Sequence, residues 1–287
     1  MSKIKLIADA SCDIELDVAK DCGIEIVPMN VIHNGKSYLS EVEISKDRVY
    51  DLVDECPELM STSQPTPEQF INSFRHAVRG GYDTLIVSTI NAAHSGTYQS
   101  ACIAKELFLE ENNKVRIEVI DSYSYSYLFG NMVMRMKEMI DAEKTVNEIL
   151  EYAYDYRERI EAFAALGTLD HLKRMGRVSG AASFIGGLLN IKPVIYVHNK
   201  NVEAHSKIRG KKNVMEQLIK LAGEVMDPDS EIMVLGCRNH DEMIEFSARI
   251  KEILGKEVRI RCSVGCVLCI NTGTNLLGLG FLRKKQN

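Results

Sequence analysis

The chain has 287 residues, of which 45% are hydrophobic and 26% charged, so it can bury a substantial core and is not a disordered protein. Forty acidic against 35 basic side chains leave a formal net charge of −5, which is unlike a protein that coats itself with nucleic acid. We therefore expect no nucleic acid partner. No run of about 18 apolar residues is present, so we also expect no transmembrane segment.

The N-terminus and the cysteines both indicate an intracellular protein. The first apolar run ends at Asp9, too early for the hydrophobic core of a signal peptide. We expect the eight cysteines to be free thiols, because a chain of this length needs no disulfides in a reducing compartment. The predicted location is therefore cytoplasmic.

Strand-like and helix-like stretches alternate through the first half of the chain. Strands are predicted at 3–8, 24–31, 84–89 and 115–120, and helices at 66–80, 97–109, 125–140 and 145–159. The first and last of these helices open with the capping boxes Thr66-x-x-Gln69 and Thr145-x-x-Glu148. Such alternation is typical of a parallel sheet with helices on both faces.

The second half is predicted to form a mixed-sheet α/β domain. Its strand candidates are 163–166, 193–198, 202–206, 231–236, 258–262 and 279–283, around helices near 211–226 and 240–254. The predicted fold class is therefore α/β with two domains, an N-terminal domain at 1–160 and a C-terminal domain at 161–287.

Two motifs resemble known sites but are interpreted as structural. Cys262, Cys266 and Cys269 have the spacing of an iron–sulfur ligand set, yet they lie in an apolar run near the end of the chain. We interpret them as small buried hydrophobic residues. The stretch 34–37 resembles the end of a phosphate-binding loop but lacks its first glycine, so it is predicted to be a turn. No motif predicts a metal site or a hydrolytic triad.

Three polar clusters lie next to predicted strands and helices, at residues 9–13, 61–65 and 93–101. In the third, Ser95 and the backbone amides of Gly96 and Thr97 are expected at a helix N-terminus, which attracts anions. Ligands of open α/β sheets bind at the carboxyl ends of the strands, where these clusters fall. Taken singly, each cluster could equally consist of ordinary helix caps.

Together with later segments, these clusters resemble the motifs of the DegV family along the full length of the chain. The matching segments are Asp9 to Asp13, Thr62 to Pro65, Ser95 to Ala101, Asp121-Ser122, Leu172 to Val178 and Ile191-Lys192-Pro193. The chain departs from the family pattern at Met175, where the family has glycine. It also has Asn271 where the family usually has histidine, and an asparagine can donate a hydrogen bond but cannot carry a proton.

The resemblance implies a DegV-like fold that binds a long-chain fatty acid such as palmitate, with no cofactor, no metal and no catalysis of its own. Thr62, Ser95, Gly96 and Asn271 would hold the carboxylate, and the C-terminal domain would close a tunnel around the acyl chain. Hydroxyls and amides can satisfy a buried carboxylate without a buried cation. Burying about 16 carbons at about 0.8 kcal/mol per CH₂ gives a gross gain of about 12 kcal/mol.

The resemblance also implies a partner in bacterial lipid transport and fatty acid metabolism. Members of the family present the bound carboxylate to the catalytic subunit of a fatty acid kinase, and the basic stretch 207–212, with Arg209, would dock that subunit. Two alternatives stay open. One is an enzyme on acyl substrates with Ser95 as nucleophile, although the sequence places no base beside it. The other is a regulatory protein that senses a fatty acid.

Overall fold

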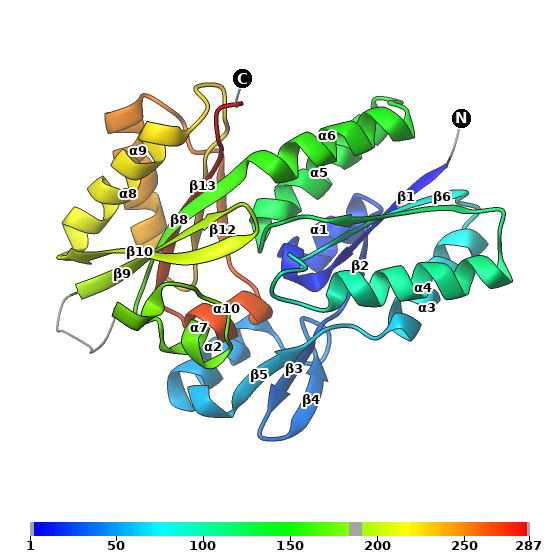
Figure 1. Cartoon of the computed structure of the whole chain (residues 1–287), viewed down its shortest axis with the longest axis horizontal. Helices are drawn as coiled ribbons and strands as arrows, with labels where there is room; N and C mark the ends of the chain where they lie inside the picture. Colours follow the sequence, from blue (N-terminus) through cyan, green and yellow to red (C-terminus); the bar gives the residue numbers. More distant parts are fainter. Residues whose placement is uncertain (1–2, 184–190, 286–287) are drawn as a thin grey trace. The chain divides into compact units, whose positions relative to one another are not determined.

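A computed structural model describes residues 3–183 and 191–285 (Figure 1). The chain divides into two compact units, each made of two separate stretches of sequence. Unit 1 contains residues 1–45 and 62–158, and unit 2 contains residues 46–61 and 159–287. The predicted domains, 1–160 and 161–287, differ from these units chiefly in the segment 46–61.

Unit 1 is built on a four-stranded parallel sheet with the strand order β2-β1-β6-β7. The strands are β1 (Ile4–Asp9), β2 (Glu25–Val27), β6 (Thr84–Thr89) and β7 (Arg116–Asp121). All six residues of β6 are buried, because this central strand is covered on both faces. The predicted parallel sheet is confirmed.

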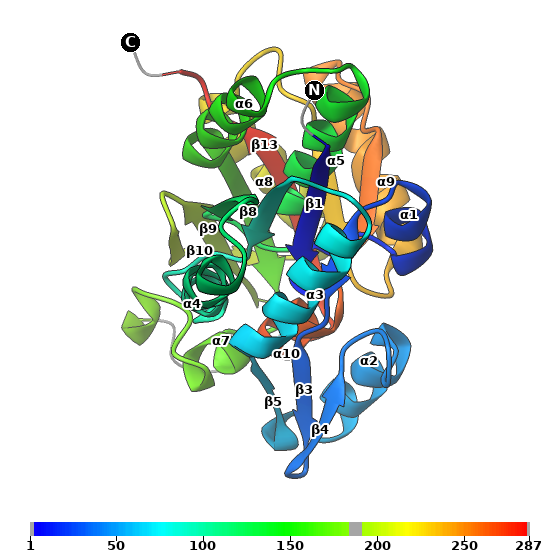
Figure 2. The same cartoon turned by 90° about the vertical axis from the view of Figure 1, so that its right-hand side faces the viewer.

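Helices cover both faces of this sheet. They are α1 (Leu16–Asp21), α3 (Pro67–Arg79), α4 (Thr97–Glu111), α5 (Tyr127–Asp141) and α6 (Val146–Arg159). Helices α3 and α4 lie on one face of the sheet (Figure 2). There Phe74 and Phe108 meet edge to face at 5.7 Å, in one buried cluster with Ile7 and Val87. Helix α5 packs against β1 on the other side. The prediction of helices on both faces is confirmed.

Two of these helices begin at the predicted capping boxes. Before α3, the Thr66 amide donates to Gln69 Oε1 at 2.9 Å, and the Gln69 amide donates to Thr66 Oγ1 at 3.3 Å. Before α6, the Thr145 amide donates to Glu148 Oε2 at 2.9 Å, and the Glu148 amide donates back to Thr145 Oγ1 at 3.3 Å. Both motifs act as predicted.

A small second sheet has the strand order β4-β3-β5, with β3 (Asn30–His33), β4 (Lys36–Leu39) and β5 (Met60–Ser63). The single strand predicted at 24–31 is wrong, because β2 and β3 are separate strands on either side of Pro28, which lacks an N–H to donate. The turn predicted at 34–37 is confirmed at its first two residues only, because Lys36 and Ser37 already belong to β4. Asn34 and Gly35 have φ of 48° and 75° and connect β3 to β4 as a two-residue hairpin loop.

Unit 2 contains a six-stranded sheet with the order β10-β9-β8-β13-β11-β12. Its strands are β8 (Ile160–Leu166), β9 (Ile191–His198), β10 (Asn201–Arg209), β11 (Met233–Gly236), β12 (Ile260–Ser263) and β13 (Leu276–Leu282). Only β11 and β12 pair in parallel, and the other neighbours are antiparallel. The predicted mixed sheet is confirmed.

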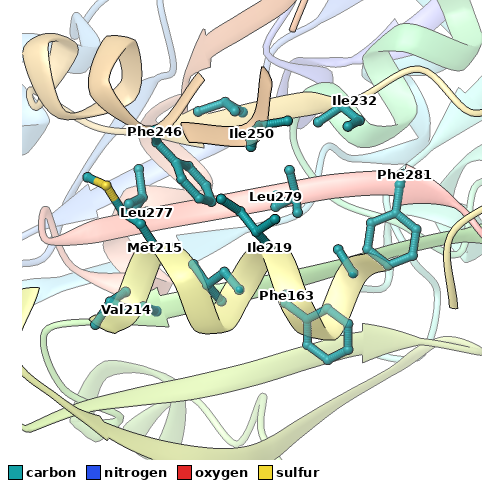
Figure 3. Close-up of a cluster of buried hydrophobic side chains, with 14 of the residues drawn as sticks. Phe163, Val214, Met215, Ile219, Ile232, Phe246, Ile250, Leu277, Leu279 and Phe281 are labelled. Carbon is teal, nitrogen blue, oxygen red and sulfur yellow. The ribbon is translucent and has the colours of Figure 1, made fainter. Parts of the chain in front are cut away.

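The core of unit 2 lies between this sheet and two helices, α8 (Lys211–Val225) and α9 (His240–Leu254). In Figure 3, Met215 and Ile219 of α8 lie beside Leu277 and Leu279 of β13, with Phe246 of α9 close by. Shorter helices complete the unit: α7 (Asp170–Arg174), η3 (Ala181–Ser183) and α10 (Cys266–Thr272). No helix within the described ranges is long and apolar enough to cross a membrane.

Specific contacts hold the segment 46–61 in unit 2, although sequence order places it among the residues of unit 1. Helix α2 (Lys46–Glu55) buries Tyr50, whose hydroxyl donates to the carbonyl of Val264. Arg238 donates to the carbonyl of Asp47 at 2.8 Å and forms an ion pair with Asp51. The short helix η2 (Pro57–Leu59) follows. The residues that hold this segment lie far along the chain, so the sequence alone did not assign the segment to unit 2.

The three clustered cysteines lie on β12 and α10. Cys266 and Cys269 are buried, as interpreted from the sequence, whereas Cys262 is half-buried. A hydrogen bond with Cys237, together with burial, raises the pKa of the Cys269 thiol. Within the described ranges, no group of His, Cys, Asp and Glu side chains is arranged to hold a metal ion.

The ends of β1 and β6 are joined by one buried carboxylate. Asp9 Oδ2 accepts from the Ile90 amide at 2.7 Å, while Oδ1 accepts from the amide and the hydroxyl of Ser11. These bonds start the short helix η1 (Ala10–Cys12) directly after β1. Burial raises the pKa of Asp9 to about 6, although the three hydrogen bonds favour the ionised form.

We predict that Gly130→Ala destabilises unit 1 by about 2–3 kcal/mol. A methyl group on Gly130, in α5, would lie 2.2 Å from the carbonyl oxygen of Cys12, which is backbone and cannot move aside. Urea unfolding measures the loss. The control is Gly223→Ala in α8, where the new methyl would meet only a Leu254 methyl at 3.3 Å, so we expect a gain of up to about 1 kcal/mol. Equal effects of the two substitutions would contradict the packing argument.

The second prediction concerns Asp9 and pH. Its folded-state pKa of about 6 lies above the unfolded value of 3.8, so the folded state holds the proton more tightly. Asp9 therefore favours folding below pH 4, and this contribution, about 3 kcal/mol, is lost as the pH rises through 6. Asp9→Asn cannot titrate. The free energy of unfolding of the wild type minus that of the variant should fall between pH 4 and pH 7, and a difference that does not change with pH would refute the assignment.

Candidate functional site

The candidate site lies in unit 1, where the strands of the parallel sheet end and polar loops begin. Asp9 closes β1, and Asp121 closes β7. Asp121 Oδ1 accepts from the Ala92 amide at 3.0 Å and from the Tyr123 amide at 3.2 Å. The loop after β6 is therefore fixed on one side by Asp9, through Ile90, and on the other by Asp121.

This loop leads to the start of α4, which carries the predicted anion site. Ser95 Oγ lies 2.8 Å from Thr97 Oγ1, and Gly96 is the N-cap residue. No side chain caps α4, and its first turn contains no acidic residue. The Thr97 amide donates to Ser95 Oγ at 3.4 Å. The other amides of the first turn are given no side-chain partner by the described residues, and their partial positive charge favours an anion. The structure places Ser95 and Gly96 where the sequence predicted them.

The Thr62 segment reaches the same helix N-terminus through Gln64. The amide end of the Gln64 side chain lies so close to Gly96 that a Cβ on Gly96 would be 2.7 Å from Gln64 Nε2. Thr62 lies on β5, half-buried, and its hydroxyl has no hydrogen-bond partner in the part of the chain that the structure describes. Two of the predicted clusters, at 61–65 and 93–101, are thus neighbours.

A hydrogen-bonded group of three side chains supports the loop before Ser95. Asn91 is fully buried, and its Nδ2 donates to the hydroxyl of Tyr125 at 2.8 Å. That hydroxyl also bonds to Nδ1 of His94, whose ring stacks on Tyr125 with 5.9 Å between ring centroids. The Tyr125 hydroxyl therefore links Asn91 to His94 and holds the loop between them.

Strained backbone marks the same edge of the sheet. Asp13, Tyr123 and Ser126 all have positive φ, at 54°, 58° and 55°. The Ser126 hydroxyl donates to the Asp13 carboxylate, so the loops after β1 and β7 hold each other. Residues other than glycine adopt such conformations at a cost of about 1–3 kcal/mol each, and they occur preferentially at functional sites.

Two predicted site residues belong to unit 2. Asn271 lies on α10, where its Nδ2 donates to the carbonyl of Val267 at 2.7 Å, so part of its donor capacity is used within the helix. Its role toward a carboxylate stays a prediction. Arg209 is the last residue of β10, and its side chain is exposed. The side chains of Lys211 and Lys212, the end of the predicted docking stretch, lie outside the described residues.

The geometry gives little support to Ser95 as a nucleophile. Its hydroxyl bonds to the Thr97 hydroxyl, which is no general base. The neighbouring His94 uses Nδ1 for Tyr125. In the described part of the chain, no carboxylate, lysine or histidine is hydrogen-bonded to Ser95 Oγ, and nucleophilic catalysis by serine needs such a base.

The residues that hold the site in place were not predicted from the sequence. Asn91 and Tyr125 were given no role, and the helix predicted from 125 begins only at Tyr127. The repeated Ser-Tyr pattern at 122–127 was the available signal, because serine favours turns over helix interiors. Contacts between residues 91 and 125 depend on strand order, which the sequence alone does not specify.

Known proteins with the same fold are similar along the whole chain. A stearic acid-binding protein from Eubacterium ventriosum has a TM-score of 0.87 and 25% identity, with 99% of each chain covered. A DegV family protein from Thermus thermophilus, described by its fatty acid binding, has a TM-score of 0.87 and 28% identity, with 98% of this chain and all of that chain covered.

Comparisons of the sequence also show similarity along nearly the whole chain. A DegV domain-containing protein of Clostridium perfringens is 30% identical over 98% of this chain and 99% of its own length. The model of the DegV family matches residues 3–284. The predicted DegV-like α/β fold is thereby confirmed, and the chain belongs to the DegV family.

Proposed function

We propose that this protein binds a long-chain fatty acid and holds its carboxylate at Thr62, Ser95 and Gly96. The observation that carries the proposal is the uncapped N-terminus of α4, with the Ser95 and Thr97 hydroxyls beside it and the Thr62 segment brought up to it by Gln64. The similar proteins from E. ventriosum and T. thermophilus, both described as binding fatty acids, support this choice of ligand.

The chemistry of these groups suits a carboxylate that is withdrawn from water. A buried carboxylate needs hydrogen-bond donors, and hydroxyls and helix amides supply them. Burial of the acyl chain supplies most of the binding free energy, at about 0.8 kcal/mol per CH₂. Donors at the carboxylate then set the orientation of the ligand more than its total affinity.

We further propose that the protein is a carrier in fatty acid metabolism and not itself a catalyst. The absence of a base at Ser95 in the described residues favours a carrier over an acyl-substrate enzyme. A carrier would present the carboxylate to the catalytic subunit of a fatty acid kinase, with the exposed Arg209 at the docking surface. Reconstitution with such a subunit separates this role from fatty acid sensing, because only a carrier would yield acyl phosphate.

The ligand can be identified directly. Freshly purified protein is unfolded in organic solvent, and the released small molecules are analysed by mass spectrometry. A stoichiometric long-chain fatty acid is expected. An empty extract, combined with no change in melting temperature on adding palmitate or stearate, would refute the proposed function, because a ligand that binds the folded state must stabilise it.

We predict that Thr62→Val and Ser95→Ala each weaken fatty acid binding by about tenfold or more while the fold persists. Each substitution removes one hydroxyl, and a hydrogen bond to a charged group contributes about 1.5–3 kcal/mol. Displacement of a fluorescent fatty acid from delipidated protein measures the affinity.

The matched control is Ser63→Ala. Ser63 follows Thr62 on β5, and successive side chains of a strand point to opposite faces, so loss of its hydroxyl should leave the affinity unchanged. Circular dichroism checks that all three variants are folded. Unchanged affinity in both Thr62→Val and Ser95→Ala, or an equal loss in Ser63→Ala, would place the carboxylate elsewhere.

A further inference from the structure

Arg157, in the last turn of α6, lies close to two tyrosine rings of unit 1. Its guanidinium carbon is 4.4 Å from the ring centroid of Tyr123 and 4.6 Å from that of Tyr154. Both distances are within the range of cation–π attraction. The Arg157 side chain is only 21% exposed, so the planar group is held in one orientation before any ligand arrives.

The hydrogen-bonding capacity of this guanidinium is largely unused. Nη1 donates to the main-chain carbonyl of Asp121 at 3.4 Å. Nε is buried and has no hydrogen-bond partner, and the structure gives Nη2 none within the described residues. The nearest carboxylate oxygen, of Glu158, is 3.6 Å from Nε, but the Glu158 side chain is 60% exposed and its attraction is weakened by solvent. Unmet donors on a partly buried cation point to an anionic ligand.

Backbone strain supports this interpretation independently. Tyr123 has φ of 58°, which is rare for a bulky side chain, and its amide donates to Asp121 Oδ1 at 3.2 Å. The strain places the Tyr123 ring against Arg157. Strain that the surrounding contacts maintain is found preferentially where a ligand is held. Asp121 also binds the Ala92 amide, so Arg157 and the loop that leads to Ser95 contact the same residue.

The shape of the site defines the class of ligand. Two tyrosine rings lie close to the guanidinium, and the N–H groups that such a cation keeps free bind oxyanions. Nε is enclosed by protein, whereas Nη2 is not among the buried atoms, so Nη2 is the donor that a phosphate oxygen can reach. We propose that Arg157, held beside Tyr123 and Tyr154, binds a phosphate oxyanion through Nη2.

Two sources can supply that group. One is free inorganic phosphate. The other is the phosphoryl group of an acyl phosphate, the product formed when the carboxylate of a bound fatty acid is phosphorylated, and this source rests on the proposed function. The site itself rests only on the contacts of Arg157.

The first experiment uses inorganic phosphate alone. Binding to the full-length protein is followed by tyrosine fluorescence, because the chain contains no tryptophan, and by isothermal titration calorimetry. Saturable binding is expected in the wild type and should weaken about tenfold or more in Arg157→Gln, with a smaller loss in Arg157→Lys, which keeps the charge but not the planar fork. The control is Arg75→Gln, since Arg75 is already paired with Glu68 and Glu111. No saturable binding to the wild type, or equal affinity in Arg157→Gln, would overturn the proposal.

The second experiment separates the sources by comparing hexadecyl phosphate with palmitate. If acyl phosphate is the source, Arg157→Gln weakens binding of hexadecyl phosphate and leaves palmitate unchanged. Equal effects on both ligands, or none on either, would overturn that source, and phosphate binding in the first experiment would then assign the site to free phosphate. Failure of palmitate to bind the wild type would refute the proposed function, while the inorganic phosphate titration would still decide the role of Arg157.

Discussion

The geometry of the candidate site depends on hydrogen bonds between backbone amides and carboxylates that are withdrawn from water. Asp9 and Asp121 end two parallel strands, and each accepts hydrogen bonds from the loop after β6, through the amides of Ile90 and Ala92. A buried amide without a partner would cost about 1–3 kcal/mol, and a buried carboxylate without donors would cost more. Both requirements are met by one arrangement of the loop, which fixes the residues that follow, including Ser95.

This fixed loop explains how strained residues persist around the site. The positive φ values of Asp13 and Ser126 are accompanied by a hydrogen bond between their side chains, and that of Tyr123 by bonds to Asp121 and contact with Arg157. Strain survives only where neighbouring contacts outweigh it. A rigid frame is what a ligand site requires, because a preorganised set of donors loses less entropy on binding than a flexible one.

Local signals in the sequence predicted the features that depend on local interactions. The capping boxes at Thr66 and Thr145, the hairpin turn at Asn34 and the hydroxyl cluster at Ser95 all appear where they were expected. Features that depend on distant contacts were missed. The segment 46–61 packs with unit 2 through partners such as Val264, about two hundred residues later. The split of the predicted strand 24–31 has both a local and a distant cause. Pro28 marks the break in the sequence, and pairing with different strands then separates β2 from β3.

The anion sites proposed for unit 1 differ in a way that fits two states of one ligand. The site at Ser95 and Gly96 offers hydroxyls and amides, which suit a single negative charge withdrawn from water without burying a cation. The site at Arg157 offers a full positive charge at a partly exposed position, which suits a phosphate of higher charge. If one site bound the carboxylate and the phosphate with equal affinity, the carrier could not release one of them selectively. A ligand shifts the protein between two states only when it binds them with different affinities. Separate sites of different charge provide that difference, and Asp121, which contacts both the Ser95 loop and Arg157, connects them.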